Sequence, residues 1–124
     1  MKTSHNSKSK QPPLTPAVFQ ILLALSEQEM HGYRIMQAVQ RNSNGQVSMG
    51  PGTLYGSIKR IMEDGLIEES GERPDPDLDD ERRRYYRLTV LGRKMVTNEA
   101  TRMEALVRKA QALHLIPNTG GEHR

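Results

Sequence analysis

Few residues in this chain of 124 residues have side chains suited to catalysis or metal binding. There is no cysteine, which excludes disulfides, thiolate catalysis and cysteine-ligated zinc. The four histidines are spread along the chain at His5, His31, His114 and His123. No serine stands in a nucleophile-elbow pattern, and no glycine-rich loop of the nucleotide-binding kinds is found. We therefore expect no metal site, no cofactor and no enzymatic activity.

Cationic and phenolic side chains are the remaining chemical groups, and they cluster in two segments. Residues 53–60 contain Lys59 and Arg60 close to Tyr55. Residues 82–87 read RRRYYR, so four arginines surround two tyrosines. Arginine and lysine bind phosphate and guanine, and hydroxyl groups add hydrogen bonds to phosphate oxygens. Both segments are candidate nucleic-acid contacts, although a helix cap, a buried ring and a solvated surface also explain their residues.

The overall charge does not decide between these interpretations. The formal net charge is +3, and the charges are segregated along the chain. Residues 1–14 carry three lysines and no acid, whereas residues 66–88 carry eight acids and five arginines. Five of those acids lie together at Asp75, Asp77, Asp79, Asp80 and Glu81. They repel phosphates unless arginines pair with them, so a self-neutralised loop and a loop that touches nucleic acid fit equally well.

Three helices are predicted to position the first cationic segment. Each combines a start signal with apolar residues at three- and four-residue spacing. They are predicted to begin after Thr15, at Gly32 and at Gly50-Pro51, and to end between Ser26 and Glu29, in the polar turn 42–45 and at Gly65. A short strand is also predicted at 46–48.

The third helix is predicted to present its basic residues to solvent. Its inward stripe consists of Leu54, Ile58, Ile61 and Met62, and its outward face of Gly56, Lys59, Arg60 and Glu63, flanked by Thr53 and Tyr55. Glycine inside a helix costs about 1 kcal/mol relative to alanine. Either the missing side chain of Gly56 lets the helix approach DNA closely, or it relieves a crowded packing contact.

A hairpin and a long last helix complete the predicted order. Strands at 66–73 and 82–88 are separated by a loop with Pro74 and Pro76, which cannot continue a sheet interior. A helix from Thr89 to Ile116 is about 40 Å long at about 1.5 Å rise per residue, longer than a small domain covers. We expect it to pair with a second copy, and the alternative is an ordinary helix packed on its own domain.

The element order is that of a winged helix-turn-helix. Within it, four motifs resemble those of the PadR family of bacterial transcriptional regulators, over about residues 14–112. The motifs are HGYRIM at 31–36, GPGTLY at 50–55, GLI at 65–67 and RRYYRLT at 83–89 with Gly92. The resemblance implies a homodimeric regulator, most often a repressor, that binds a palindromic operator. Some relatives respond to small aromatic compounds, so an unidentified small-molecule effector is a further candidate partner.

These observations combine into a mainly α fold with a small β-hairpin, a winged helix-turn-helix plus a long C-terminal dimerisation helix. We expect a flexible basic arm at 1–14, a DNA-binding domain at 15–88, the dimerisation helix at 89–116 and a disordered tail at 117–124. No segment approaches the roughly 18 apolar residues of a membrane span, so we expect a cytoplasmic protein.

The resulting site predictions fall into two sets. The expected contacts to double-stranded DNA are Thr53, Tyr55, Gly56, Lys59, Arg60, Arg82, Arg83 and Arg84. The expected dimer contacts are Val96, Ala100, Met103, Leu106, Val107 and Ala110, assisted by the first helix. The alternative function is a protein-interaction module that uses the same fold without reading DNA, and the basic outward face of the third helix favours DNA over it.

Overall fold

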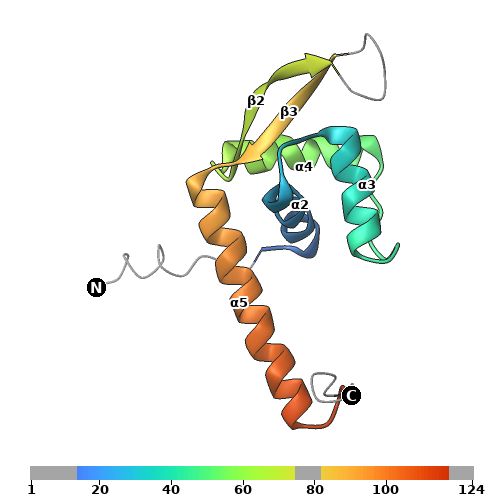
Figure 1. The fold of residues 1–124 in the computed structure, drawn as a ribbon, viewed down its shortest axis with the longest axis vertical. Coiled ribbons are helices and arrows are strands. Elements are labelled where there is room, and N and C mark those ends of the chain that lie inside the picture. Colours follow the sequence, from blue (N-terminus) through green and yellow to red (C-terminus); the bar gives the residue numbers. More distant parts are fainter. Residues whose placement is uncertain (1–13, 75–81, 118–124) are drawn as a thin grey trace, which may run out of the picture.

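The structure, a computed structural model, describes residues 14–74 and 82–117 (Figure 1). Its elements in chain order are α2 (Pro16–Glu27), β1 (Met30–His31), α3 (Gly32–Asn42), α4 (Pro51–Glu63), β2 (Ile67–Pro74), β3 (Arg82–Leu88) and α5 (Val90–Ala112). The expected mainly α fold with a small hairpin and a long last helix is confirmed. The predicted arm and tail, except Leu14 and Pro117, lie outside the described residues, as does the acidic loop between the hairpin strands.

Side-chain caps define where three of the helices begin. Thr15, His31 and Thr89 each accept a hydrogen bond from the backbone N–H three residues later, at 3.2, 3.2 and 3.0 Å. The Thr89 hydroxyl also donates to the Gly65 carbonyl oxygen at 2.6 Å. Gly65, where the sequence predicts the end of the third helix, follows α4 with φ of 79°, a left-handed conformation that glycine adopts readily. Local capping rules therefore position these helix ends correctly.

The sheet has three antiparallel strands in the order β1-β3-β2, one more than the predicted hairpin. β1 pairs with β3 through Met30 and Tyr86, and a two-residue strand is too short to show an alternating pattern in the sequence. The strand predicted at 46–48 is wrong. There the Ser43 hydroxyl accepts from the Val47 N–H at 2.9 Å and lies 3.3 Å from the Val47 carbonyl oxygen. This side chain satisfies the backbone that a neighbouring strand would otherwise satisfy.

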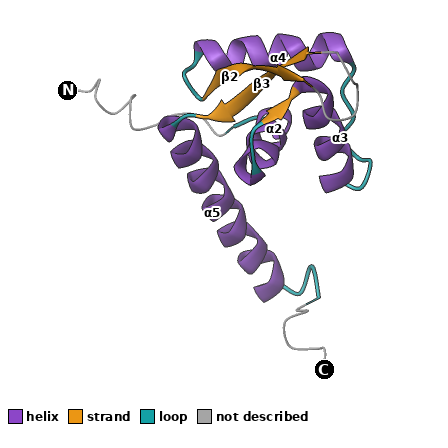
Figure 2. Ribbon diagram, turned by 45° about the horizontal axis from the view of Figure 1, so that its top comes forward, coloured by secondary structure: helices purple, strands orange, loops and turns teal. Residues whose placement is uncertain are grey.

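Helices α2, α3 and α4 pack with the sheet around one hydrophobic core (Figure 2). Its most deeply buried side chains include Ile21, Leu22, Ile35, Leu54, Ile58 and Ile61, each at most 1% exposed. Burial of each such side chain stabilises the fold by about 1.5–3 kcal/mol. Because all three helices contribute to this core, it fixes the orientation of α4 relative to the sheet.

Helix α5 extends away from this body (Figure 1). Its buried residues are Gly92, Val96 and Glu99, all in its first half. Gly92 lies against the backbone of Leu66, where any Cβ would overlap the carbonyl oxygen. The second half carries exposed apolar side chains, among them Leu106 at 57% exposure. No helix in the described part of the chain combines the length and the apolar character needed to cross a membrane.

Candidate nucleic-acid interface

The two faces of α4 divide as the sequence predicts. Leu54, Ile58 and Ile61 are buried in the core, and Met62 is half-buried against it. The predicted outward residues Thr53, Tyr55, Gly56, Lys59, Arg60 and Glu63 are all exposed. Within the described residues, neither Lys59 nor Arg60 forms an ion pair. The helix thus presents two unpaired cations on a face whose orientation the core determines.

Gly56 lies in the middle of this exposed face. A Cβ built there meets no atom within 4 Å, so crowding inside the described chain does not explain the glycine. Crowding does explain Gly32, at the start of α3, where a Cβ would overlap the Tyr55 hydroxyl group. The two glycines therefore differ in role: one leaves a helix surface open, and the other leaves room for a neighbouring ring.

The N-terminus of α4 is also open to solvent. Gly50 is the N-cap and Pro51 occupies the first turn, so no side chain caps the helix. Both Gly50 and Gly52 are exposed, and a Cβ on either would meet no atom within 4 Å. Backbone N–H groups and the helix dipole favour an anion at such a terminus.

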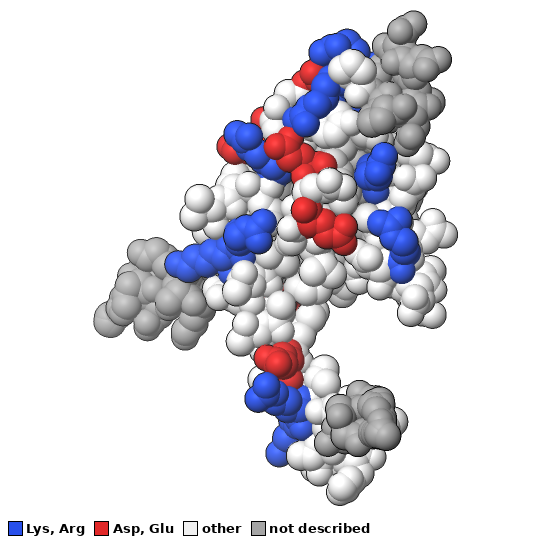
Figure 3. All heavy atoms as spheres, viewed as in Figure 1, with Lys and Arg blue, Asp and Glu red and all other residues white. Residues whose placement is uncertain are grey.

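The arginines of β3 are arranged differently from the cations of α4. Arg82 donates to the Glu72 carbonyl oxygen at 2.8 Å, and the Arg83 guanidinium lies 6.0 Å from the centre of the Tyr33 ring. The Arg84 Nε is 3.8 Å from carboxylate oxygens of both Glu69 and Glu72. Figure 3 shows Lys or Arg side chains next to Asp or Glu side chains over β2 and β3, the two strands that we call the wing. Much of the positive charge of the wing is therefore compensated locally.

A further cluster, which sequence reasoning missed, lies around Arg73 of β2. The Arg73 guanidinium bonds to the Glu29 carboxylate and to the Ser70 hydroxyl, and it lies 4.1 Å from the centre of the Tyr85 ring. Hydrogen bonding to Arg73 holds the pKa of Glu29 below its ordinary value. These contacts hold β2 against the segment between α2 and β1. Glu29 and Arg73 are 44 positions apart, so no local pattern marks the pair.

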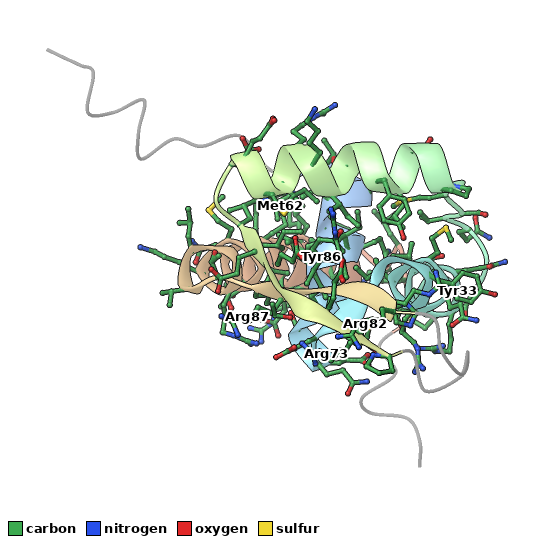
Figure 4. All side chains as sticks on the ribbon, turned by 90° about the horizontal axis from the view of Figure 1, so that it is seen from above. Tyr33, Met62, Arg73, Arg82, Tyr86 and Arg87 are labelled. Carbon is green, nitrogen blue, oxygen red and sulfur yellow. The ribbon has the colours of Figure 1, made fainter. Side chains whose placement is uncertain are left out.

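The faces of the wing are separated in Figure 4. Tyr86 lies between the sheet and α4, whereas Arg73 and Arg87 lie on the side away from α4. Tyr86 is 4% exposed and Leu88 is half-buried against the core, so these two side chains of β3 face inward. On the outer face, Glu68 accepts a hydrogen bond from Arg87 at 2.8 Å and raises the pKa of the guanidinium.

One pocket gathers predicted contacts from α4 and from the wing. It has a volume of about 290 Å³ and is lined by His31, Gly32, Tyr55, Arg82, Arg83, Arg84 and Tyr86. We call it the α4–β3 pocket. Lys59 and Arg60 are not among its lining residues and lie one to two helical turns beyond Tyr55 on the exposed side of α4. The structure thus divides the predicted DNA contacts between an open helix face and a pocket beside it.

The predicted dimer contacts divide between a buried part and an exposed part of α5. Val96 is 5% exposed and belongs to the core of its own chain. Met103 and Ala110 are half-exposed, Ala100 is exposed, and Leu106 and Val107 are 57% and 46% exposed. The interpretation of α5 as a helix packed on its own domain therefore holds for its first half, whereas its second half keeps an uncovered apolar stripe in the single chain.

Glu99 is a buried acid that the sequence analysis did not single out. Its side chain is 6% exposed and bonds to Arg102, with Nε to Oε1 at 3.2 Å. The hydrogen bond from Arg102 lowers the pKa of Glu99 below its ordinary value, and a hydrogen bond from the Leu14 backbone N–H contributes less to the same shift. The sequence signal for its burial was its spacing of three residues from Val96, which places both side chains on the same helix face. Among the described residues, no group of three or more histidines or acids could hold a metal ion.

Comparison with known proteins gives related sequences. A model of the PadR-like family of transcriptional regulators matches residues 21–98. Transcriptional regulator Rv3488 of Mycobacterium tuberculosis is 34% identical over 89 residues, which are 72% of this chain and 77% of that protein. An uncharacterised 37.1 kDa protein in transposon TN4556 of Streptomyces fradiae is 33% identical over 86 residues, which are 69% of this chain and 22% of that protein. The chain thus spans less than a quarter of the Streptomyces relative.

Solved structures share the fold. A PadR family regulator from Clostridium difficile has a TM-score of 0.63 and 21% identity, covering 77% of this chain and 95% of that one. Bacillus subtilis PadR, solved in complex with operator DNA, has a TM-score of 0.58 and 20% identity, covering 69% of this chain and 47% of that one. Together with the match over 21–98 and the mycobacterial relative, these findings establish that the chain belongs to the PadR-like family of transcriptional regulators.

Proposed function

We propose that this chain is a sequence-specific DNA-binding transcriptional regulator, a repressor that occupies a palindromic operator as a homodimer. The observation that carries the proposal is the exposed face of α4, where Lys59 and Arg60 are unpaired within the described residues beside the open backbone of Gly56. The structure of Bacillus subtilis PadR with operator DNA supports it, since that protein has the same fold.

In this proposal α4 enters the major groove. Its inward stripe belongs to the core, so the helix is presented rigidly, and the side chains that reach bases or phosphates come from the outer face. Lys59 and Arg60 bind phosphate or guanine, and the open N-terminus of α4 approaches a phosphate. The arginines of β3 lie beside the helix and contact the DNA backbone. Because they are partly compensated by acids, they contribute less than the cations of α4.

The homodimer is proposed to form through the second half of α5. Its uncovered stripe contains Leu106 and Val107, and a second copy of the same stripe would bury both. Such a symmetric dimer presents two α4 helices, and a palindromic operator has the matching two-fold symmetry.

The test of the function is selection of bound fragments from genomic DNA, followed by titration of the selected duplex at several salt concentrations. The logarithm of affinity should fall with the logarithm of salt, with a slope of about 0.9 per phosphate contact. Absence of any selected fragment at low salt, or a flat salt dependence, favours the protein-interaction module instead.

The test of the dimer is the double variant Met103→Asp, Val107→Asp, studied by light scattering. We expect a dimer for the parent and a monomer for the variant, because two carboxylates per chain would be buried without partners. Both positions are at least partly exposed in the single chain, so the variant should keep its circular dichroism spectrum. A monomeric parent, or a variant that remains dimeric, contradicts the proposed interface.

A further inference from the structure

The α4–β3 pocket is lined mainly by side chains that donate hydrogen bonds. Its lining residues include three arginines and two tyrosines, and none of them is acidic. Burial raises the pKa of Tyr86 above the ordinary value of a phenol. Among the described residues, Glu69 and Glu72 lie 3.8 Å from Arg84, and neither lines the pocket. Guanidinium and phenol groups are hydrogen-bond donors, so the pocket is suited to an anion with several acceptor oxygens.

Gly32 determines where one of these phenols lies. A Cβ at this position would overlap the Tyr55 hydroxyl and would lie 2.5 and 2.8 Å from the ring atoms Cζ and Cε1. Any residue other than glycine at this position would therefore displace Tyr55. Tyr55 remains 43% exposed, so its hydroxyl is packed on one side and accessible on the other.

The position of the pocket indicates what the anion is. Figure 4 shows α4 and the wing strands next to each other, with Tyr86 between them. The exposed face of α4 bears Lys59 and Arg60 on the same helix that supplies Tyr55 to the pocket. A DNA strand that borders the groove occupied by α4 would carry its phosphates past this junction between helix and wing.

We propose that the α4–β3 pocket binds one phosphodiester group of the DNA backbone, that the Tyr55 hydroxyl donates a hydrogen bond to it, and that Gly32 is a positioning residue for Tyr55. The inference rests on the proposed function, because the phosphodiester belongs to the duplex that α4 reads. It adds a ligand group for this pocket and a role for Gly32, which is not itself a DNA contact.

The first test uses Tyr55→Phe, which keeps the ring against Gly32 and removes the hydroxyl. Its affinity for the duplex selected by the parent should fall about two- to tenfold, as expected for one lost hydrogen bond. The duplex is then scanned with single neutral methylphosphonate linkages. At one linkage per half-site the parent should lose affinity, and Tyr55→Phe should lose clearly less, because its hydrogen bond to that linkage is already absent. Equal losses for both proteins at every linkage overturn the proposal.

The matched control is Tyr33→Phe. Tyr33 is 49% exposed and lies near Arg83, but it does not line the pocket. Its hydroxyl can be removed without changing the ring that Arg83 faces, and affinity for the selected duplex should stay within twofold of the parent. A loss equal to that of Tyr55→Phe shows that any tyrosine hydroxyl on this surface matters, and the assignment of the pocket is then wrong.

The positioning role is tested with Gly32→Ala in two backgrounds. In the parent it should lower affinity at least as much as Tyr55→Phe, because the new methyl group displaces the Tyr55 ring. In a Tyr55→Ala background it should cost nothing further, because the ring is absent. Equal losses in both backgrounds overturn the positioning role. Circular dichroism checks the fold, and if Gly32→Ala does not fold, the methylphosphonate scan with Tyr55→Phe still decides the phosphate assignment.

Two further outcomes separate this inference from the proposed function and from a soluble ligand. If the parent binds no duplex, the proposed function fails and the phosphodiester assignment fails with it. If the parent binds DNA but Tyr55→Phe is unchanged on every duplex, the phosphodiester assignment alone fails. Saturable binding of inorganic phosphate, lost in Tyr55→Phe while DNA binding is kept, assigns the pocket to a free phosphate compound and overturns the backbone contact.

Discussion

The exposed face of α4 and the wing both carry clustered cations, yet the structure puts those cations in different environments. Lys59 and Arg60 form no ion pair within the described residues, whereas Arg73, Arg84 and Arg87 each lie within 4 Å of an acid. The basic composition of a segment is therefore a poor measure of the charge that it offers to a polyanion. On binding DNA, unpaired cations on α4 would release counterions directly, whereas paired cations on the wing would first have to lose a partner.

The largest expected effect comes from Lys59→Ala, Arg60→Ala. If Arg60 reads a guanine, the selected duplex should lose about 1–3 kcal/mol for that contact in addition to the phosphate contribution, so its affinity falls about 10- to 100-fold or more. A scrambled duplex should lose less, and the salt slope should decrease by about 0.9 per phosphate contact. Fluorescence anisotropy with both duplexes measures this. Unchanged binding of both duplexes would remove α4 as the reading helix.

A smaller and uniform effect is expected from Arg82→Ala, Arg83→Ala. Both residues line the α4–β3 pocket, but Arg82 is engaged with the Glu72 carbonyl oxygen and Arg83 lies near the Tyr33 ring. Backbone contacts carry no sequence information, so selected and scrambled duplexes should lose affinity equally, by about tenfold or less. A larger loss for the selected duplex than for the scrambled one would show that the wing reads sequence, which would reverse the comparison.

The wing cluster around Arg73 should affect stability and not DNA affinity. Glu29 has a pKa below its ordinary value of 4.5 in the folded state, so it stabilises the fold at pH above 4.5. That stabilisation is lost as the pH falls through the folded value. Urea unfolding between pH 3 and 6 should show a steeper loss of stability for the parent than for Glu29→Gln. Lys59→Ala, Arg60→Ala should follow the parent curve, and a shared change in both variants would contradict the division of roles.

The features predicted correctly from the sequence rest on local signals. The helix starts after Thr15, His31 and Thr89, the helix end at Gly65 and the two faces of α4 are all determined by residues within one or two turns of each other. Such signals fix the ends and the orientation of single elements. They did not predict that residues 46–48 form no strand. There the Ser43 hydroxyl, and not a neighbouring strand, bonds to the Val47 backbone.

The missed features join residues that are distant in the sequence. Gly32 and Tyr55 meet across two helices, and Glu29 binds Arg73 across 44 positions. Val96 shares the spacing of the exposed stripe on α5 but packs into the core, because the first half of that helix lies against the domain. A periodic pattern shows that a helix face is apolar, and only the tertiary arrangement shows which chain covers it.

The smallest expected effect has the opposite sign and comes from Glu72→Gln. The Glu72 carboxylate is 3.8 Å from Arg84, and the substitution removes its charge while keeping the backbone carbonyl that Arg82 uses. Exposed ion pairs are worth about 0–1 kcal/mol, so removing one of the two carboxylates beside Arg84 should raise affinity for any duplex by about two- to threefold. The salt dependence should become slightly steeper, because one more cation would displace counterions.

The matched control for this gain is Glu68→Gln on the same strand. Glu68 and Glu72 are similarly exposed, at 49% and 53%, and both substitutions add one positive charge to the wing. Glu68, however, pairs with Arg87, which lies on the side of the sheet away from α4 (Figure 4). If DNA contacts the wing beside α4, Glu72→Gln should gain more affinity than Glu68→Gln at every salt concentration. Equal gains would mean that only net charge matters, and a larger gain for Glu68→Gln would place the DNA on the other face of the wing.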